Sequence, residues 1–448
     1  MNQEKNNITE GVIWKQILIF FFPILIGTFF QQLYNTVDAL VVGRFANKEA
    51  LAAVSGSAGS FINFVVGFLS GLSAGATVTI AQFYGSKDKK KLDEALHTAY
   101  AFAAISGILF GILGVALAPH IIDWMHTDPK LVEASIVYLR IYFSGLIFVI
   151  IYNIGAGILR AIGDSKRPLY VLIFCAMLNI ILDLYYVAVL GLGVIGVAVA
   201  TLISQAVSSV IVTYLLMKRT PGLQLVLSNI RIHRDSLWRI LHVGLPSGLQ
   251  SSLYSVSNML IQSTINGFGV DTVTAWGTIA KIDNIIWMIY GAFNVAVTTF
   301  VGQNYGAKKW KRIREAVNVS LVMCFSSAVV LSILIYKYGA FLIGIFIPDQ
   351  AVVQIGMEIF SIMAKGYAVF AFLEIYSAAL QAEGRVMVPT IISLLGVCAF
   401  RVIWVLFIVP GGTLSQIIIC YPMTWIICSI LCTIYYFYKQ KRIEAAGI

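Results

Sequence analysis

Long apolar segments recur along this chain from one end to the other. Each is about 20 residues or longer, the length that an α-helix needs to cross the hydrocarbon core of a bilayer. Charged residues make up only 12% of the 448 residues, whereas soluble globular proteins average about 25%. The sequence therefore predicts a membrane protein with twelve helical spans, at 16–43, 51–83, 93–118, 133–159, 168–190, 194–217, 240–266, 272–302, 316–347, 355–380, 389–410 and 414–438.

The positive charge is distributed unevenly between the loops. Lysines and arginines cluster in alternate loops, at 86–91, 160–168, 217–239, 306–314 and 439–442. The loops between them hold few basic residues, such as Arg44 and Lys130. This alternation is typical of cytoplasmic loops, so we expect both termini in the cytoplasm. A nucleic-acid-binding surface would not alternate with the spans, and we expect no nucleic-acid partner despite the net charge of +10.

The chain contains an internal repeat. The segment "AQFYGSKDKKKLDEAL" (81–96) resembles "GQNYGAKKWKRIREAV" (302–317), and "LRAIGDSKRP" (159–168) resembles "LQAEGRVMVP" (380–389), both at an offset of 221. Pro23 also matches Pro246 at an offset of 223. Three blocks in the same order indicate two homologous halves of six spans each, namely residues 1–218 and 240–448 with a cytoplasmic linker at 219–239.

The repeat fixes the fold class that we predict. Six is an even number, so both halves enter the membrane in the same direction and are parallel repeats. Many secondary transporters are built from such repeats, with sites near the midplane and rocking of one half against the other. We predict an all-α polytopic membrane protein with twelve transmembrane helices in two pseudo-symmetric six-helix bundles around a central cleft.

A polar stripe crosses the first span. Gln31, Tyr34, Asn35 and Asp38 lie at helical spacing and share one face. A charged side chain at the centre of a span costs about 2.5–3.5 kcal/mol on insertion scales, so this face should point to a bundle interior or a water-filled cavity. Gln31 and Asn35 could equally serve as polar contacts between helices. For Asp38, the cost of burying a carboxylate favours a functional site.

A second carboxylate lies in the fifth span. Asn179 and Asp183 are four residues apart on one face, and Thr201 follows in the next span. Hard cations prefer oxygen ligands, so Asp38, Asn179, Asp183 and Thr201 form a candidate site for H⁺ or Na⁺, with Na⁺ as the possible metal ion. Their repeat counterparts are all apolar, which places the ion site in the first half: Ile261, Phe400, Trp404 and Pro422.

Other polar residues are candidates for contacting a substrate in the central cleft. Tyr254 and Asn258 belong to a polar stripe on the seventh span, and Glu374 is the repeat counterpart of Asn153. The residues predicted to line the cleft are Gln31, Tyr34, Asn35, Asn153, Tyr254, Asn258, Lys281 and Glu374.

Several charged residues lie inside spans of the second half. Lys281 and Asp283 are two residues apart and do not face each other, so we expect Lys281 to pair with Glu374 or to form a local structural ion pair. Lys365 and Arg401 are expected to reach the membrane surface with their long side chains or to stabilise loops.

Sequence motifs for other kinds of chemistry are missing. The chain has no P-loop, no dinucleotide-binding glycine pattern and no nucleophile elbow, and its six cysteines and five histidines show no metal-ligand spacing. We therefore expect no enzymatic activity and no cofactor, and we do not expect ATP to drive transport by this chain alone.

The motifs together resemble the multidrug and toxic compound extrusion (MATE) family, in the branch similar to DinF-type and MepA-type bacterial exporters. The resemblance covers essentially the whole chain. Its carriers are "YNTVDALVVGRF" (34–45), the paired "AQFYG" (81–85) and "GQNYG" (302–306), "LRAIGDSKRP" (159–168) and "LNIILD" (178–183). In related members the ion site falls on the positions of Asp38, Asn179, Asp183 and Thr201. Some members place a glutamate where this chain has Tyr254, which argues against a cation site of that type in the second half.

The resemblance implies a secondary active exporter. We expect antiport of small organic, often cationic, compounds out of the cell against inward H⁺ or Na⁺, by alternating access. We also expect a monomer that contacts membrane lipids in the bacterial inner (plasma) membrane. The alternatives are a lipid-linked precursor flippase of the same superfamily, which would favour more helices and a cationic cleft, and a membrane enzyme.

Overall fold

The computed structural model describes residues 8–46, 48–218, 220 and 222–445, and these are almost entirely helical. The first seven residues of the predicted first half, and Arg219 and Pro221 of the predicted linker, lie outside the described residues. In the first part of the chain the elements are α1 (Ile13–Phe45), α2 (Lys48–Ser55), α3 (Ser57–Ser86), α4 (Lys89–Trp124), α5 (Pro129–Ser144), α6 (Leu146–Ala161), α7 (Lys166–Asp183), the π-helical η1 (Leu184–Val189), α8 (Gly193–Lys218), the 3₁₀ turn η2 (Leu227–Asn229) and α9 (Arg234–Asn266).

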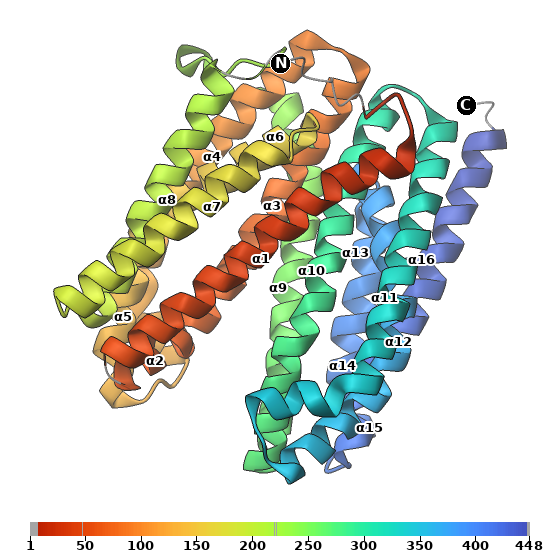
Figure 1. The fold of residues 1–448 in the computed structure, drawn as a ribbon. Helices are drawn as coiled ribbons and strands as arrows, with labels where there is room; N and C mark the ends of the chain where they lie inside the picture. The colour runs from red at the N-terminus through yellow and green to blue at the C-terminus, as the bar shows by residue number, and fades with distance from the viewer. Residues whose placement is uncertain (1–7, 47, 219, 221, 446–448) are drawn as a thin grey trace. The chain divides into compact units, whose positions relative to one another are not determined.

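The second part of the chain also consists mainly of long helices (Figure 1). Its elements are α10 (Val270–Gly306), α11 (Trp310–Phe346), α12 (Gln350–Ala382), α13 (Met387–Ser393), the π-helical η3 (Leu394–Ala399), α14 (Phe400–Ile403), the π-helical η4 (Trp404–Ile408), α15 (Leu414–Ile418) and α16 (Cys420–Ala445). The all-α polytopic fold class predicted from the sequence is confirmed.

All twelve predicted spans coincide with helices. Among the described residues, ten helical segments are long and apolar enough to cross a membrane, and α5 with α6 forms an eleventh span that is bent by 48°. The seventh predicted span, 240–266, falls on α9. This helix is less apolar than the others because serines, glutamines and asparagines recur along it, among them Gln250, Ser257 and Asn258.

The internal repeat is also visible in the backbone conformation of the residues that follow equivalent helices. Lys87 and Lys308 follow α3 and α10 with left-handed φ angles of 59° and 57°. Gly163 and Gly384 follow α6 and α12 with φ angles of 95° and 81°. Both pairs are separated by 221 residues, the offset found in the sequence. Since a left-handed residue commonly ends a helix, the two halves stop and restart their helices at equivalent positions.

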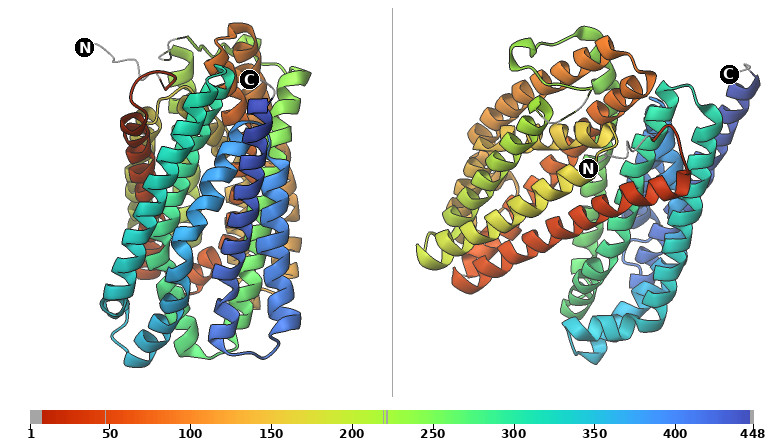
Figure 2. Two further views of the ribbon diagram at one scale, coloured as in Figure 1. Left: turned by 90° about the vertical axis from the view of Figure 1, so that its right-hand side faces the viewer. Right: turned by 45° about the horizontal axis from the view of Figure 1, so that its top comes forward.

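The chain folds into two compact units. One contains Phe22–Gly248, and the other contains Ile8–Phe21 together with the chain from Leu249 onward. The division falls inside α1 and inside α9, so the first turns of each of these helices belong to the unit opposite to the rest of the helix. Within each unit the long helices run side by side (Figure 2). The predicted limits of the two halves at 218 and 240 remain predictions.

Glycines allow α9 to lie against α3 within the first unit. A Cβ atom on Gly71 would lie 2.3 Å from the backbone nitrogen of Gly248, and one on Gly75 would lie 2.1 Å from the carbonyl oxygen of Ile240. Such close backbone approach is the usual reason for paired small residues between membrane helices. The start of α9, from Arg234 to Gly248, is therefore packed tightly into the first unit.

Large aromatic side chains fill the core of the second unit. Trp425, Tyr367 and Tyr290 are each at most 2% exposed. Trp287 lies edge-on to Phe370 and to Trp425, with ring centroids 5.0 and 5.9 Å apart. Edge-on and offset ring pairs stabilise a core beyond the area that they bury, so this unit has a rigid centre next to the polar residues described below.

Candidate functional site

The helix α7 brings two polar side chains into the interior of the first unit. Asn179 is 2% exposed and Asp183 is fully buried. Neither carboxylate oxygen of Asp183 and neither polar atom of the Asn179 side chain has a hydrogen-bond partner among the described residues. A buried polar atom without a partner is costly, so these atoms are available to bind something other than the protein.

The backbone changes at Asp183. The α-helix ends at this residue and continues as the π-helical turn η1, Leu184–Val189. π-helical turns are rare and are frequent at functional sites. In the second half, η4 occupies the equivalent stretch after Ile403. Both halves therefore share the local geometry, but only the first half places a carboxylate there.

The helix α1 supplies the second carboxylate. Asp38 and Asp183 lie close enough for their carboxyl groups to interact directly. One oxygen of Asp38 is buried without a hydrogen-bond partner among the described residues. Two carboxylates that are in direct contact repel each other when both are ionised. A bound proton or a small cation would remove that repulsion.

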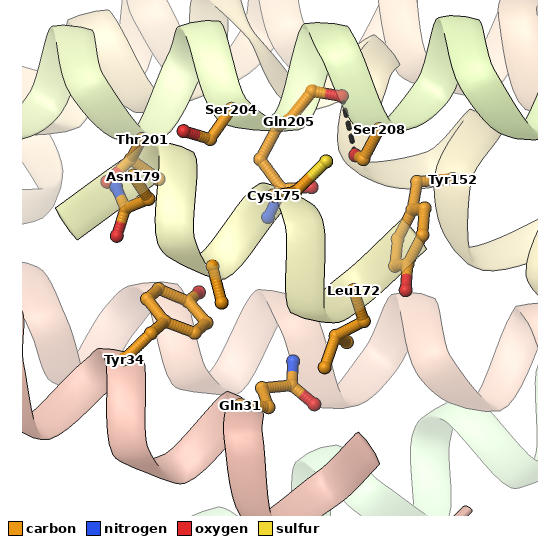
Figure 3. Close-up of a pocket in the computed structure, with 11 residues that line it drawn as sticks. Gln31, Tyr34, Tyr152, Leu172, Cys175, Asn179, Thr201, Ser204, Gln205 and Ser208 are labelled. Carbon is orange, nitrogen blue, oxygen red and sulfur yellow. Dashed lines mark hydrogen bonds between the residues drawn. The ribbon is translucent and has the colours of Figure 1, made fainter. Parts of the chain in front are cut away.

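The first unit also contains a small cavity, which Asn179 lines but Asp38 and Asp183 do not. Its volume is about 40 Å³, and four helices of the first unit enclose it, namely α1, α6, α7 and α8 (Figure 3). The lining side chains are Gln31, Tyr34, Tyr152, Leu172, Cys175, Ala176, Asn179, Thr201, Ser204, Gln205 and Ser208. Such a volume holds a few water molecules or an ion but is far below the roughly 300–1,000 Å³ of pockets for drug-sized ligands.

The structure brings most of the predicted first-half residues together. Gln31, Tyr34, Asn179 and Thr201 line the same cavity. Asn35 does not: it is exposed and donates to Gln32 Oε1 at 3.5 Å. Asn153 also does not line the cavity, because its side-chain amide donates to the Val149 carbonyl one turn earlier, at 2.8 Å.

Three tyrosines of this site were not predicted. Tyr152 lines the cavity. Tyr138 lies within electrostatic range of both Asp38 and Asp183, and Tyr142 lies within the same range of Tyr34. The sequence offers little signal for them, because aromatic residues at helical spacing within a span are more often core residues than site residues.

The predicted residues of α9 lie near a buried arginine. Arg401 is 2% exposed, donates to Asn258 Oδ1 at 3.4 Å and lies 3.9 Å from the centroid of the Tyr421 ring. Tyr254, also on α9, lies within electrostatic range of the same guanidinium. The expectation that Arg401 reaches the membrane surface or stabilises a loop is therefore wrong. Cation–π contact and a hydrogen bond offset the cost of its burial. Lys365, for which the same was expected, is exposed.

The expected pairing of Lys281 with Glu374 is also wrong. Glu374 accepts a hydrogen bond from Asn294 Nδ2 at 2.7 Å. Lys281 is exposed, and its ammonium lies 5.6 Å from the centroid of the Phe346 ring. Its sequence neighbour Asp283 is buried and accepts a hydrogen bond from Trp287 Nε1 at 2.9 Å. Glu374 therefore has an amide donor in place of the expected ammonium.

The four residues predicted for the ion site offer oxygen atoms as ligands: Asp38, Asn179, Asp183 and Thr201. Among the described residues, no group of three or more His, Cys, Asp or Glu side chains is placed to hold a metal ion. Asp38 and Asp183 interact with each other, and Asn179 and Thr201 line the cavity. All four carry oxygen atoms of the kind that hard cations prefer. The site could equally bind a proton on one carboxylate.

Comparison with known proteins identifies one matching family model. A family model described as MatE matches residues 23–185 and 246–406. The two matched stretches begin at the repeated prolines and together cover most of the chain.

The relatives are named as drug transporters. The "Probable multidrug resistance protein YoeA" of Bacillus subtilis (strain 168) is 28% identical over 440 residues, covering 96% of this chain and 95% of its own. The "Multidrug export protein MepA" of Staphylococcus saprophyticus is 23% identical, covering 89% and 88%. Among solved structures, "Outward-facing conformation of a multidrug resistance MATE family transporter of the MOP superfamily" superposes with a TM-score of 0.90 at 23% identity, covering 99% of this chain and 99% of that one.

Proposed function

This chain belongs to the MatE family of membrane transporters, and from that membership we propose that it exports small organic compounds, many of them cationic, against an inward flow of H⁺ or Na⁺. The names of the relatives, "Probable multidrug resistance protein YoeA" and "Multidrug export protein MepA", support multidrug efflux as the activity. We assign it no enzymatic reaction. Its place is the bacterial plasma membrane, as a monomer with both termini in the cytoplasm.

The single observation that supports ion coupling best is the carboxyl pair in the first unit. Asp38 and Asp183 interact directly, and both oxygens of Asp183 lack a partner among the described residues. A proton or Na⁺ that enters between them relieves their mutual repulsion. Its binding free energy therefore depends on how closely α1 approaches α7.

That dependence is what antiport requires. An ion can bias a conformational equilibrium only if it binds one state more tightly than the other. When α1 lies close to α7, the ion gains both carboxylates and the oxygens of Asn179 and Thr201. When α1 moves away, it loses Asp38. We propose that this difference couples ion entry to substrate release.

The substrate itself must bind outside the small cavity, because about 40 Å³ is too little for a drug-sized compound. We propose that it contacts the polar residues predicted from the sequence, with aromatic and carboxylate groups to favour organic cations. This set consists of Gln31, Tyr34, Asn35, Asn153, Tyr254, Asn258, Lys281 and Glu374.

Reconstituted liposomes provide the test. Export of a fluorescent organic cation is followed under an imposed pH gradient and, separately, under a Na⁺ gradient. Wild type and Asp38→Asn are compared, since asparagine keeps the shape but removes the charge. The proposal expects one gradient to drive transport in wild type and Asp38→Asn to abolish it while dye binding is retained.

Two outcomes would argue against the proposal. If neither gradient moves the dye although the protein binds it, ion-coupled export of cations is wrong and lipid-linked substrates become the next candidates. If a gradient drives export equally in wild type and Asp38→Asn, export stands but the carboxyl pair is not the coupling site.

A further inference from the structure

One arginine of α11 holds the segment that leads into α1. Arg312 donates to the carbonyl oxygens of Ile8, Glu10 and Gly11 at 2.8–3.2 Å, and to Gln16 Oε1 at 2.9 Å. A guanidinium presents five donors in a rigid planar fork, so it can bind several acceptors at once with little loss of side-chain entropy. A single side chain thus fixes both the approach to α1 and its first turn.

Neighbouring residues pack and bond the same segment. Lys309 Nζ donates to the Thr9 carbonyl at 2.8 Å, and Asn304 Nδ2 to the Ile8 carbonyl at 3.5 Å. Ile8 is 3% exposed. The Arg312 guanidinium also lies 5.9 Å from the centroid of the Phe300 ring. The segment before α1 is therefore held on α10 and α11 by both apolar burial and hydrogen bonds.

The first half contains an equivalent anchor made of different residues. The segment before α9 is held on α4, the repeat counterpart of α11. Val226 N–H donates to His97 Nε2 at 3.1 Å, and His233 N–H donates to Thr98 Oγ1 at 3.0 Å. In each half, therefore, the helix that carries the third predicted span, α4 or α11, helps to hold the approach to the first predicted span of the other half. The two halves thus hold equivalent segments with different residues, which indicates that holding these segments is important for the function of the fold.

The internal repeat does not have an arginine at the position equivalent to Arg312. Its counterpart at the offset of 221 is Lys91, which pairs instead with Asp88 at 3.5 Å and is exposed. The arginine fork thus exists only where the anchored helix is α1, the helix that carries Asp38. The repeat scaffold alone does not explain it.

The helix α1 belongs to both compact units. Its beginning, up to Phe21, lies with α11 in the second unit, and from Phe22 onward it lies with α7 in the first. Pro23 follows this division, and a proline inside a helix removes one backbone hydrogen bond and favours bending. A helix fixed at one end and able to bend next to the fixed part can transmit a displacement between the two units.

We propose that Arg312 is a positioning residue for transport: by fixing the start of α1 to α11, it makes an ion-dependent displacement of Asp38 act on the second unit. This inference rests on the proposed function. It assigns to Arg312 no contact with substrate or ion. Without Arg312, α1 would still respond to the ion, but its start would be held only by the remaining contacts of Ile8, Thr9 and Phe21. The second unit would then follow the displacement less closely.

The test compares Arg312→Ala and Arg312→Lys with wild type in liposomes under the driving gradient. Lys311→Ala is the matched control, because Lys311 is the exposed neighbour on the same helix. Three quantities are measured: the maximal rate of dye transport, the dye affinity in detergent and the Tm. We expect Arg312→Ala to lower the maximal rate by at least about tenfold, which corresponds to about 1.4 kcal/mol in the barrier, with dye affinity unchanged.

The lysine variant separates positioning from charge. An ammonium restores the charge and some of the hydrogen bonds but not the planar fork, so Arg312→Lys should transport at an intermediate rate. A cysteine at Thr9 should react with a maleimide faster in Arg312→Ala than in wild type, which shows that the segment has been released. If Arg312→Ala does not fold, Gln16→Ala, which removes one acceptor of the fork, carries the same measurements with a smaller expected effect.

The outcomes distinguish this inference from the proposed function. If wild type itself transports under no gradient, the proposed function fails. If wild type transports and Arg312→Ala transports equally fast, the positioning role of Arg312 is overturned while the function stands. A loss of transport accompanied by an equal loss of dye affinity and Tm, not rescued by lysine, would make Arg312 merely structural.

Discussion

At the scale of single residues, the buried carboxylate of Asp183 makes the folded protein less stable than an amide at the same position would. Its two oxygens lack hydrogen-bond partners among the described residues and face another carboxyl group, so removing the charge relieves a desolvation cost. We predict that Asp183→Asn melts at the same temperature as wild type or higher, yet loses gradient-driven transport by at least about tenfold, the factor that corresponds to about 1.4 kcal/mol. Thermal unfolding in detergent and liposome transport check both parts.

The control for this substitution is Asp123→Asn, which removes an exposed carboxylate near the end of α4 and should change neither quantity. A clear drop in the Tm of Asp183→Asn would contradict the prediction, since it would mean that the carboxylate stabilises the fold. Asp183 would then be a structural residue whose loss of transport follows from unfolding.

A second residue-scale prediction concerns pH. Burial raises the pKa of Glu383 from 4.5 to about 7, and the nearby Arg385 offsets this only in part. The folded state therefore keeps a proton that the unfolded state releases. This stabilisation is present below about pH 4.5 and is lost as pH rises through about 7. We predict that the Tm of wild type falls between pH 5 and pH 8 more than that of Glu383→Gln.

The pH effect of Glu383 should amount to roughly 2–3 kcal/mol across this range, at about 1.4 kcal/mol for each unit of pKa change. Glu133→Gln, which removes an exposed carboxylate on α5, should melt with the pH profile of wild type. Identical profiles for Glu383→Gln and wild type would show that Glu383 is ionised in the folded protein throughout.

Single residues also mark where sequence reasoning reached its limit. Asp38 and Asp183 could be predicted to lie together because each is costly in a membrane and each needs a partner. Arg401 could not be placed, because a long basic side chain inside a span can either reach the surface or fold inward. Only the position of Tyr421 and Asn258 decides between these, and tertiary packing sets it. Tyr138 and Tyr152 could not be distinguished from ordinary core aromatic residues, because tertiary packing also decides which aromatic side chains reach the site.

At the scale of secondary-structure elements, the backbones of α3 and the start of α9 approach each other closely in the first unit. An added Cβ on Gly75 would lie 2.1 Å from the Ile240 carbonyl oxygen, and two backbones cannot yield locally. We predict that Gly75→Ala destabilises the protein by about 1–3 kcal/mol, the usual cost of overpacking, and lowers the Tm in detergent.

The matched control is Gly277→Ala on α10, where nothing lies within 4 Å of the added methyl group. Alanine is intrinsically favoured over glycine in a helix by about 0.5–1 kcal/mol, so this variant should melt at or slightly above the wild-type temperature. Equal melting of Gly75→Ala and wild type would mean that α3 and α9 are not in close contact in solution.

The elements themselves were largely predictable, because a run of about 20 apolar residues has few alternatives to a membrane-spanning helix. What the runs could not reveal was their internal geometry. The predicted span 133–159 is two helices, α5 and α6, bent by 48° at Gly145. The π-helical turn after Asp183 also leaves no mark in hydropathy. Both features depend on backbone hydrogen bonds that composition does not determine.

At the scale of the whole molecule, the halves found in the sequence and the compact units differ in one respect. The predicted halves place all of α1 in the first half and α9 from residue 240 onward in the second. Contacts instead assign the beginning of each helix to the opposite unit. Sequence similarity records descent by duplication, whereas contacts record packing, so the exchange of helix starts could not have been read from the repeat.

The orientation of the chain in the membrane is the last whole-molecule prediction. Basic residues cluster in alternate loops, which places the segment after α8 in the cytoplasm and the loop between α4 and α5 outside. Cysteines introduced as Asn229→Cys and Lys130→Cys test this, because both positions are exposed. The six native cysteines are buried, so background labelling is low. A membrane-impermeant maleimide should label Lys130→Cys in intact cells and Asn229→Cys only after the membrane is opened.

Both variants should label equally in detergent, which confirms that each thiol is reactive. The orientation matters for the mechanism because Asp38 lies on α1 toward the end away from Arg312, about 38 Å of helix from Ile13 at a rise of about 1.5 Å for each residue. If the basic loops are cytoplasmic, the carboxyl pair lies in the outer half of the first unit, where an external ion can reach it. The opposite labelling pattern would place the pair near the cytoplasm, and an inwardly directed ion gradient could not then load it from outside.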